Sequence, residues 1–408
     1  MTKVIFIFRQ YAGIPPSPGG YQHFSLAKCM VNDGYNVYLY VSNFNHVTKT
    51  YDKKFTECFL IEEIQGVNVV WVNNRPSYKN NGFRRLVGMI DYSVKAYLAA
   101  RSISKGDHRA SMIVGSVAHS FAVLSAWYFS WKRKIPLWID ISELWPEAYL
   151  QSGVISKSHP LTYMLGGLAN FLYKKGDFVT VINSNTKDFI VSNRGVSEGR
   201  VHVFVPGFEC EESPLCEPRA VLKEDTPFRV IYTGGLGDLY PLEELIKAVS
   251  NLIKNQYNIE VQIVGDGPRK NSFISLVQEF GITDSVKFFQ AEKKANLWAM
   301  YADSDVLLVI EKNVKYGFPS KLLDYFNAAR PVLMASDADY PLPDELFIKC
   351  SPTAVEIEKA LKKLMALDDE TIGKIGSDTF IFAKENYGTS SQYMSLISPK
   401  LKSLDLKN

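Results

Sequence analysis

Two charged side chains one helical turn apart, Lys321 and Asp324, could together bind a ligand that carries both phosphate and sugar groups. Lys321 falls in the predicted first turn of a helix, where the helix dipole is positive and a cation is normally disfavoured. The ammonium, the dipole and the free amides of that turn would favour a phosphate or a diphosphate. The Asp324 carboxylate could accept hydrogen bonds from vicinal hydroxyls of a sugar. The same spacing also fits a weak surface ion pair, so both interpretations stay open at this point.

The segment that positions this pair is residues 317–332, which read GFPSKLLDYFNAARPV. Its apolar residues recur at helical spacing and predict a buried side made of Leu322, Leu323, Phe326 and Ala329. Pro319 is expected to open the helix, Ser320 to cap it through its side-chain oxygen, and Pro331 to end it. A short amphipathic helix between two apolar strands is the pattern of a parallel α/β sheet.

The composition describes a globular protein that is long enough for two domains. The 408 residues are 46% hydrophobic and 22% charged, which excludes a disordered chain. The longest apolar run, residues 112–131, is interrupted by His119 and several serines and fits a strand and a helix better than a membrane span. No signal peptide precedes the first strand, so we expect a cytoplasmic protein. The cysteines lack metal-ligand or redox spacing and are expected to be reduced thiols: Cys29, Cys58, Cys210, Cys216 and Cys350.

The net charge of +3 hides an asymmetry between the two halves of the chain. Residues 1–205 hold 23 Lys and Arg against 13 Asp and Glu, a net charge of +10, whereas the remainder carries −7. Such a division indicates two domains with different partners. The sequence contains no recognised nucleic-acid motif, and an anionic membrane surface fits the basic half. The predicted helix 84–105 and the segment 127–134 (WYFSWKRK) are expected to lie on that membrane, although an ordinary surface helix would look similar.

The chain contains two successive runs of alternating strands and helices, which predict two α/β domains with a ligand in the cleft between them. We expect a first domain over residues 1–205, a linker over 206–227 and a second domain over 228–385. A helical segment, residues 386–408, is expected to pack back on the first domain. Gly20, at the head of the first helix, would let a ligand approach the backbone closely.

Residues at predicted strand ends are candidates for chemistry, because ligands in open α/β sheets bind beyond the carboxyl ends of the strands. In the first domain, Asp140 and Glu143 follow the strand 135–141, and His119 follows a shorter strand. A lone histidine in an apolar segment is as often a buried core residue, so both interpretations of His119 stay open. In the second domain, residues 303–305 (DSD) have the spacing of a metal motif, but their place before a buried strand indicates a structural turn.

The order of several short motifs resembles that of family-4 glycosyltransferases of the GT-B fold. In the second half these motifs are TGGLG, VGDGP, VKFFQAE, YADSDVLLV and PSKLLDY. In the first half they are the glycine loop, ELWPE and the segments TVINSNTKDFI and VHVFVPGFE. The likeness covers nearly the whole chain, and its motifs are similar to those of bacterial enzymes of O-antigen and capsule assembly. It implies an α/β protein with two Rossmann-like domains that face each other across a cleft.

The resemblance implies a transferase that moves a sugar, with retention of configuration, from a nucleotide-sugar donor that we expect to be a UDP-sugar. The implied acceptor is a glycan or a polyprenyl-diphosphate-linked sugar in surface polysaccharide biosynthesis, so the membrane contact would be peripheral. No cofactor or metal is expected, because helix dipoles and Lys321 could stabilise the leaving diphosphate. Two alternatives stay open, namely a nucleotide-sugar 2-epimerase of the same fold and an inactive glycosyltransferase-like binding protein.

Carried over by position, the resemblance implies a nucleotide-sugar site in the second domain. Asp324 matches the acid that binds the ribose, whereas Tyr316 stands where the family has a further acid. Gly235 and Tyr240 stand near positions where many members carry a phosphate-binding arginine and lysine, and Lys321 could restore one of these charges. With Gly20 of the first domain, the expected site residues are Gly234, Gly235, Leu236, Gly265, Phe289, Pro319, Ser320, Lys321 and Asp324.

The catalytic side chain is expected from the first domain. Many family members carry a histidine just before the acid at this strand end, and here that position is Ser142. Glu143 matches the acid and is the first candidate for binding or deprotonating the acceptor, followed by Asp140 and His119. Arg9 is a weaker candidate for one of the missing phosphate-binding charges.

Overall fold

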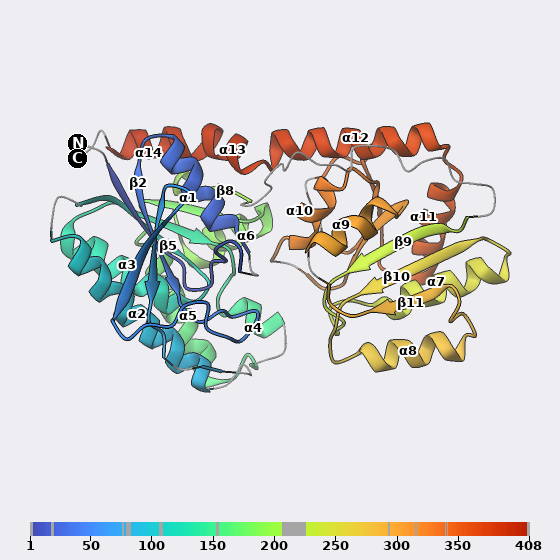
Figure 1. The fold of residues 1–408 in the computed structure, drawn as a ribbon, viewed down its shortest axis with the longest axis horizontal. Helices are drawn as coiled ribbons and strands as arrows, with labels where there is room; N and C mark the ends of the chain where they lie inside the picture. The colour runs from blue at the N-terminus through green and yellow to red at the C-terminus, as the bar shows by residue number, and fades with distance from the viewer. Residues whose placement is uncertain are drawn as a thin grey trace. The chain divides into compact units, whose positions relative to one another are not determined.

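The computed structural model describes residues 3–17, 20–75, 77–78, 83–105, 109–151, 155–205, 226–292, 294–314, 316–338, 340 and 342–405. The chain divides into two compact units, each an α/β sandwich built on one sheet (Figure 1). The first unit combines Met1–Glu209 with Tyr316–Phe318 and Tyr387–Asn408. The second combines Cys210–Lys315 with Pro319–Asn386.

The first unit contains an eight-stranded sheet in the order β3-β4-β2-β1-β5-β6-β7-β8. All neighbours are parallel except β3, which pairs antiparallel with β4 at one edge. The central strand β1 reads as the continuous apolar run VIFIF because helices cover both faces of the sheet. The strands are β1 (Val4–Phe8), β2 (Asn36–Ser42), β3 (Phe59–Ile64), β4 (Val67–Val72), β5 (Ala110–Ser116), β6 (Leu137–Ile141), β7 (Phe178–Val181) and β8 (Val201–Val203).

Two helical layers enclose this sheet (Figure 1). One layer contains α2 (Phe83–Ile103), α3 (Ser120–Arg133), α5 (Pro160–Tyr173) and α6 (Ser184–Arg194). The other contains α1 (Gln22–Asn32) and the C-terminal helices α13 (Thr389–Gln392), η2 (Tyr393–Ile397) and α14 (Ser398–Asp405). The short helices α4 (Glu147–Gln151) and η1 (Glu198–Arg200) lie in connections.

The second unit contains a six-stranded parallel sheet in the order β11-β10-β9-β12-β13-β14. Its strands are β9 (Phe228–Thr233), β10 (Ile259–Val264), β11 (Val286–Phe289), β12 (Val306–Glu311), β13 (Val332–Ser336) and β14 (Phe347–Cys350). On one face pack α7 (Leu242–Lys254), α8 (Lys270–Glu279) and α11 (Ala354–Met365). The remaining helices are α9 (Lys294–Ala302), α10 (Ser320–Asn327) and α12 (Asp369–Asn386) (Figure 1).

The structure confirms the predicted α/β architecture with two Rossmann-like units, and it differs from the sequence prediction in detail. Strand β3 was not predicted, because its alternating sequence FLIEEI is half exposed at the sheet edge. Helix α10 has the predicted buried side but ends at Asn327, well before Pro331, because Ala329 adopts a positive φ of 47°. The helix also begins differently: Pro319 occupies the N-cap position and Ser320 is the first helical residue, so the predicted serine cap is wrong.

The remaining predictions concern the linker, the cysteines and the absence of a membrane span. The predicted linker 206–227 lies outside the described residues except at its last two positions, as do Cys210 and Cys216. Among the described residues, Cys29, Cys58 and Cys350 form no disulfide. Within the described part of the chain, no helix has the length and apolar character needed to span a membrane.

Candidate functional site

The second sheet contains a reversal of strand order between β9 and β12, which lie side by side at its centre. Ligands of open α/β sheets bind beyond the carboxyl ends of the strands at such a reversal. The loop 233–237 (TGGLG) leaves β9 at this point, and Glu311 ends β12. Helix α10, which carries Lys321 and Asp324, begins a few residues after β12. The predicted site residues of this unit therefore gather at the place where the topology favours binding.

The loops after β9 and β10 touch each other so closely that only glycine fits. A Cβ atom on Gly265, whose φ is 149°, would lie 1.9 Å from the carbonyl oxygen of Gly234. A Cβ atom on Gly267 would lie 2.4 Å from the carbonyl oxygen of Leu236. Gly234 has a φ of 147°, and a Cβ atom there would meet Lys321 Nζ at 2.7 Å. These glycines let two backbones and an ammonium group share one small volume.

Leu236 holds the two loops together. Its side chain is buried, its amide donates to the carbonyl of Asp266 over 3.0 Å, and its carbonyl accepts from the amide of Arg269 over 2.9 Å. These two backbone bonds give Leu236 a structural role between the loops, and its predicted contact with a ligand stays a prediction. Gly235 is exposed next to it and remains accessible, with the ring of Tyr240 packed 3.3 Å from the position of its missing Cβ.

Lys321 points its ammonium into this volume. Nζ lies 4.0 Å from the ring centre of Tyr232 and 4.9 Å from that of Tyr240, so two aromatic faces support the cation. The stem is partly exposed, whereas Nζ is buried and has no hydrogen-bond partner among the described residues. Burial lowers the pKa of Lys321 to about 7, although the charge of Glu311 opposes the shift. A buried ammonium without a hydrogen-bond acceptor is a group that an anion would complete.

Glu311 is a member of this site that the sequence analysis missed. The residue is only 5% exposed, and its carboxylate accepts hydrogen bonds from Tyr340 Oη and, over 3.2 Å, from Ser336 Oγ. Burial raises the pKa of Glu311, although these hydrogen bonds and the charge of Lys321 oppose the rise. The acid at the end of the apolar run VLLVIE was the signal, because strand ends of this kind carry functional groups.

The other predicted residues of the second unit surround this volume less directly. Asp324 is partly exposed one turn after Lys321, and Ser320 is exposed at the helix start, whereas Pro319 is buried. Phe289 ends β11 partly exposed, and its carbonyl accepts from the amide of Gly265 over 3.2 Å. The ring of Tyr325 fixes α10 against the glycine loop, since its hydroxyl lies 3.0 Å from the amide nitrogen of Thr233.

The turn at residues 303–305 is structural, as predicted. Asp303 forms an ion pair with the guanidinium of Arg229, and Asp305 Oδ2 accepts from the amide of Arg229 over 2.7 Å. Both carboxylates therefore hold the start of β9.

In the first unit, Asp140 is at the centre of a buried polar network. One carboxylate oxygen accepts from His23 Nε2 over 2.9 Å and from Ser116 Oγ over 2.6 Å, and the other accepts from Thr180 Oγ1 over 2.9 Å. Burial favours the neutral acid, but the hydrogen bonds and the charge of Arg9 outweigh it and hold the pKa of Asp140 below its usual value. Asp140 is 1% exposed and binds four elements together, which explains its place without a catalytic role.

His119 is the N-cap of α3. Its Nδ1 accepts from the amide of Ala122 over 3.2 Å, so Nε2 carries the proton and donates to Gln10 Oε1. Burial lowers the pKa of His119 to about 3, and the charges of Arg9 and Arg85 act in the same direction. A fully buried, neutral histidine with both nitrogens bonded fits the structural interpretation better than the catalytic one.

Glu143 and Gly20 remain accessible at the carboxyl edge of the first sheet. Glu143 follows β6 with an exposed side chain, and its charge acts on the guanidinium of Arg9. Arg9 Nη1 donates to Ser116 Oγ over 3.1 Å and to Ser142 Oγ over 2.6 Å, which joins it to the Asp140 network. Gly20 is exposed just before α1. Of the predicted catalytic candidates, Glu143 is the one whose carboxylate a substrate could reach.

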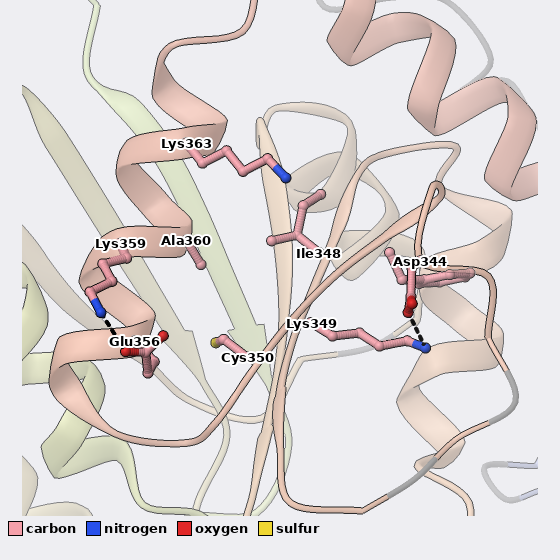
Figure 2. Close-up of a pocket in the computed structure, with 9 residues that line it drawn as sticks. Asp344, Ile348, Lys349, Cys350, Glu356, Lys359, Ala360 and Lys363 are labelled. Atoms are coloured by element: carbon pink, nitrogen blue, oxygen red, sulfur yellow. Dashed lines mark hydrogen bonds and ion pairs between the residues drawn. The ribbon is translucent and has the colours of Figure 1, made fainter.

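A cavity of about 460 Å³ lies elsewhere in the second unit, between β14 and α11 (Figure 2). Figure 2 shows two of its lysines in ion pairs, Lys349 with Asp344 and Lys359 with Glu356. Its lining includes none of the predicted binding residues. The third lysine of the lining, Lys363, is exposed, whereas the Lys321 ammonium is a buried cation without a hydrogen-bond partner among the described residues, so the site at the glycine loops remains the stronger candidate.

Known proteins that resemble this chain include glycosyltransferases. Residues 217–348 match the family model described as "Glycosyl transferases group 1". A curated protein of Pseudomonas aeruginosa, described as "Probable glycosyltransferase WbjE", is 25% identical over 281 residues, which make up 63% of this chain. The match spans 65% of the length of that relative.

Solved structures resemble nearly the whole chain. HepE of Anabaena in complex with UDP has a TM-score of 0.67 at 14% identity, covering 98% of this chain and 100% of that one. Sucrose-phosphate synthase of Thermosynechococcus elongatus has a TM-score of 0.70 at 14% identity, covering 99% and 100%. The fold is that of the GT-B glycosyltransferases. The family match and the curated relative support the predicted enzyme class, a glycosyltransferase.

Proposed function

We propose that this protein transfers a sugar from a UDP-sugar, with retention of configuration, to a glycan or a lipid-linked sugar in surface polysaccharide biosynthesis. The observation that carries the proposal is the buried Lys321 ammonium, which lacks a hydrogen-bond partner among the described residues at the carboxyl end of the second sheet. The relative described as a probable glycosyltransferase supports sugar transfer, and the structures of HepE with UDP and with UDP-glucose support a nucleotide-sugar donor.

In the proposed reaction, the second unit stabilises the leaving diphosphate. Negative charge grows on the diphosphate as the bond to the sugar breaks, and fixed positive groups lower that barrier. Lys321, the positive N-terminal end of α10 and the exposed Gly235 backbone would supply such groups, and Asp324 would hold the ribose. We also propose that no metal is required, so activity should survive incubation with EDTA. Glu143 of the first unit would bind or deprotonate the acceptor hydroxyl.

Calorimetry with UDP tests the donor site. Lys321→Ala and Asp324→Ala should each weaken UDP binding by about tenfold or more, because each removes a charged hydrogen-bonding partner. Lys312→Ala is the matched control, since Lys312 is exposed close by in the same unit. Unchanged affinity in both site variants would refute the assignment. Incubating a UDP-sugar without acceptor then separates the activities, because an epimerase would produce a second nucleotide sugar and a glycosyltransferase would not.

The first unit also presents an apolar face that fits the proposed membrane contact. One side of α2 exposes Phe83, Val87, Ile90, Val94 and Leu98, at 37–79% exposure and at helical spacing. Helix α3 adds Trp131 at 63%, and α5 adds Tyr163 at 72%. Ring contacts connect the three helices, since Tyr97 lies 5.3 Å from Tyr128 and Trp127 lies 4.8 Å from Phe171. Exposed cations flank this face: Arg84, Arg101, Lys132, Arg133, Lys134 and Lys175.

We propose that this face rests on an anionic bilayer, because apolar side chains can enter the interface while the cations meet lipid phosphates. The protein should sediment with vesicles that contain phosphatidylglycerol at low salt, and Val94→Glu should abolish most of that binding. Ile381→Glu, which charges a similarly exposed apolar residue on α12, should leave it unchanged. Failure of the unaltered protein to sediment, or equal binding by Val94→Glu, would contradict the membrane contact without affecting the donor site.

A further inference from the structure

A second group of side chains gathers at the carboxyl edge of the first sheet. Tyr11 follows β1, His46 and Lys49 follow β2, Tyr78 follows β4, and Arg85 lies at the start of α2. We call these five residues the aromatic–cationic cluster. None of them belongs to the donor site or to the apolar face described above. They come from three connections and the first turn of α2, so the topology of the sheet, not the local sequence, brings them together.

Short contacts join the members of the aromatic–cationic cluster. The rings of Tyr11 and His46 have centroids 4.8 Å apart, and the Arg85 guanidinium lies 5.6 Å from the ring centre of Tyr11. Lys49 Nζ lies 3.4 Å from His46 Nδ1 and 5.0 Å from the ring centre of Tyr78. Because an ammonium can only donate, His46 Nδ1 must be the acceptor, and the imidazole is neutral.

The charges in the cluster have the same sign. Burial lowers the pKa of His46 to about 4, and the positive charges of Lys49, Arg85 and Arg9 lower it further. Among the residues that the structure describes, no carboxylate forms an ion pair with Lys49. Like charges brought together in this way do not stabilise a fold, so a ligand of opposite charge is the simplest explanation for their arrangement.

The backbone also holds Lys49 in an uncommon conformation. Its φ is 59°, in the left-handed region that lysine rarely adopts. Asn45 fixes the turn, because its side-chain oxygen accepts from the amides of Val47 over 2.8 Å and Thr48 over 3.2 Å. Strain of this kind is typically kept where it places a side chain for function. The turn directs the Lys49 ammonium at His46 and Tyr78.

We propose that the aromatic–cationic cluster binds the acceptor through a phosphate or diphosphate group attached to its sugar. Arg85 and Lys49 would hold the phosphate oxygens, since guanidinium and ammonium groups both pair well with phosphate. The aromatic rings would pack against the sugar. Glu143 and Arg85 both act electrostatically on the hydroxyl of Tyr149, so the proposed base lies near the cluster. This inference rests on the proposed glycosyl transfer, because that reaction is what requires an acceptor.

The ring signals of His46 in NMR spectra report on this site alone. They can be assigned by their loss in His46→Gln, and glucose 1-phosphate serves as the probe with UDP present to occupy the donor site. Binding of the phosphate should shift the His46 signals and raise the pKa of the ring, because a nearby anion favours the imidazolium. Lys49→Ala should weaken this binding by about tenfold, which corresponds to the loss of one charged contact. Lys54→Ala, an exposed lysine outside the cluster, should leave it unchanged.

Two further probes decide the chemical class of the acceptor. Glucose should bind at least about tenfold more weakly than glucose 1-phosphate, because it lacks the charge. Glucuronate carries a carboxylate, so equal or tighter binding of glucuronate would overturn the assignment to phosphate. An unshifted His46, or equal binding by Lys49→Ala, would overturn the site itself. UDP affinity is measured separately, so loss of UDP binding would refute the donor site while the His46 signals still test this one.

Discussion

Lys321 illustrates how one residue can be costly for folding and useful for binding. Its ammonium is buried against two tyrosine rings, and burial brings its pKa down to about 7 from the ordinary lysine value near 10.5. In the unfolded chain the amine stays protonated up to that higher pH. Protonation of the buried amine therefore opposes folding fully below pH 7, and this penalty disappears as the pH rises towards 10.5. When an anionic ligand binds beside the amine, it stabilises the charged form and so offsets the penalty of burying the protonated amine.

The affinity for UDP should depend on pH through the ionisation of Lys321. A terminal phosphate is fully ionised above about pH 7, so changes at higher pH report on the protein. UDP affinity should fall progressively from pH 7 to pH 9 as Lys321 loses its proton. Calorimetry across this range checks the prediction. In Lys321→Met the affinity should be low and nearly independent of pH, and an equal slope in both proteins would assign the titration to another group.

Substitutions of two candidate catalytic residues, Glu143 and His119, should have opposite effects on kcat. Glu143 is exposed at the end of β6, so Glu143→Gln should lower kcat by about 100-fold or more, as expected for the loss of a general base. UDP affinity should not change, because Glu143 belongs to the other unit. Steady-state kinetics with a suitable acceptor check the result, with the exposed Glu63→Gln as control. An unchanged kcat would remove Glu143 from the mechanism.

His119→Asn completes that comparison. Asparagine is a good N-cap residue, so α3 should keep its cap, while the bond to Gln10 is lost. We expect a loss of about 1 kcal/mol in the free energy of unfolding and little change in kcat. A fall in kcat as large as that of Glu143→Gln, in a protein that still binds UDP, would restore His119 as a catalytic residue.

At the scale of elements, the two glycine loops position the donor site. Gly265→Ala places a methyl group against the carbonyl of Gly234 and requires a left-handed φ of alanine. Strain and steric overlap together should cost about 2–3 kcal/mol of unfolding free energy and also weaken UDP binding. Gly237→Ala is the matched control in the neighbouring loop after β9, because nothing lies within 4 Å of its added Cβ. Urea unfolding followed by circular dichroism measures the difference, and equal midpoints would show that the loops can separate.

The elements that sequence reasoning found are those with a strong local signal. Buried parallel strands such as β1 and β12 read as unbroken apolar runs, so they could be recognised without tertiary information. Strand β3 could not, because its half-exposed pattern becomes a strand only by pairing with β4. The end of α10 depends on the positive φ of Ala329, which no residue type in the segment requires.

Prediction of the candidate site from sequence was limited in the same way. Lys321 was predicted because its type conflicts with its place in a helix, and such conflicts are visible in sequence. The structural role of Asp140 was not predicted, because its partners come from three other elements. These partners are His23, Ser116 and Thr180. The aromatic–cationic cluster likewise depends on which loops the sheet order brings together. Sequence identifies reactive residues one at a time, whereas their partners follow from topology.

At the scale of the whole molecule, the first unit is completed by residues from the far end of the chain. Ile397 and Leu401 are buried in the same core as Ile5 and other residues of the N-terminal strands. Asp33 ties the segment down, since it accepts from Tyr393 Oη over 2.9 Å, from Ser398 Oγ over 2.7 Å and from Lys402 Nζ over 3.1 Å. Burial favours the neutral form of Asp33, but these hydrogen bonds hold its pKa below the usual value.

Folding of the first unit should therefore depend on a segment nearly 400 residues from its first strand. Ile397→Ala should destabilise that unit by about 2–5 kcal/mol, because it leaves a cavity in a core where the side chain is fully buried. Met394→Ala, on the same segment but 56% exposed, should change stability by less than about 0.5 kcal/mol. Five of the six tryptophans belong to the first unit, so urea unfolding followed by their fluorescence reports mainly on it. Equal midpoints for the two variants would mean that the first unit holds its core without the C-terminal segment.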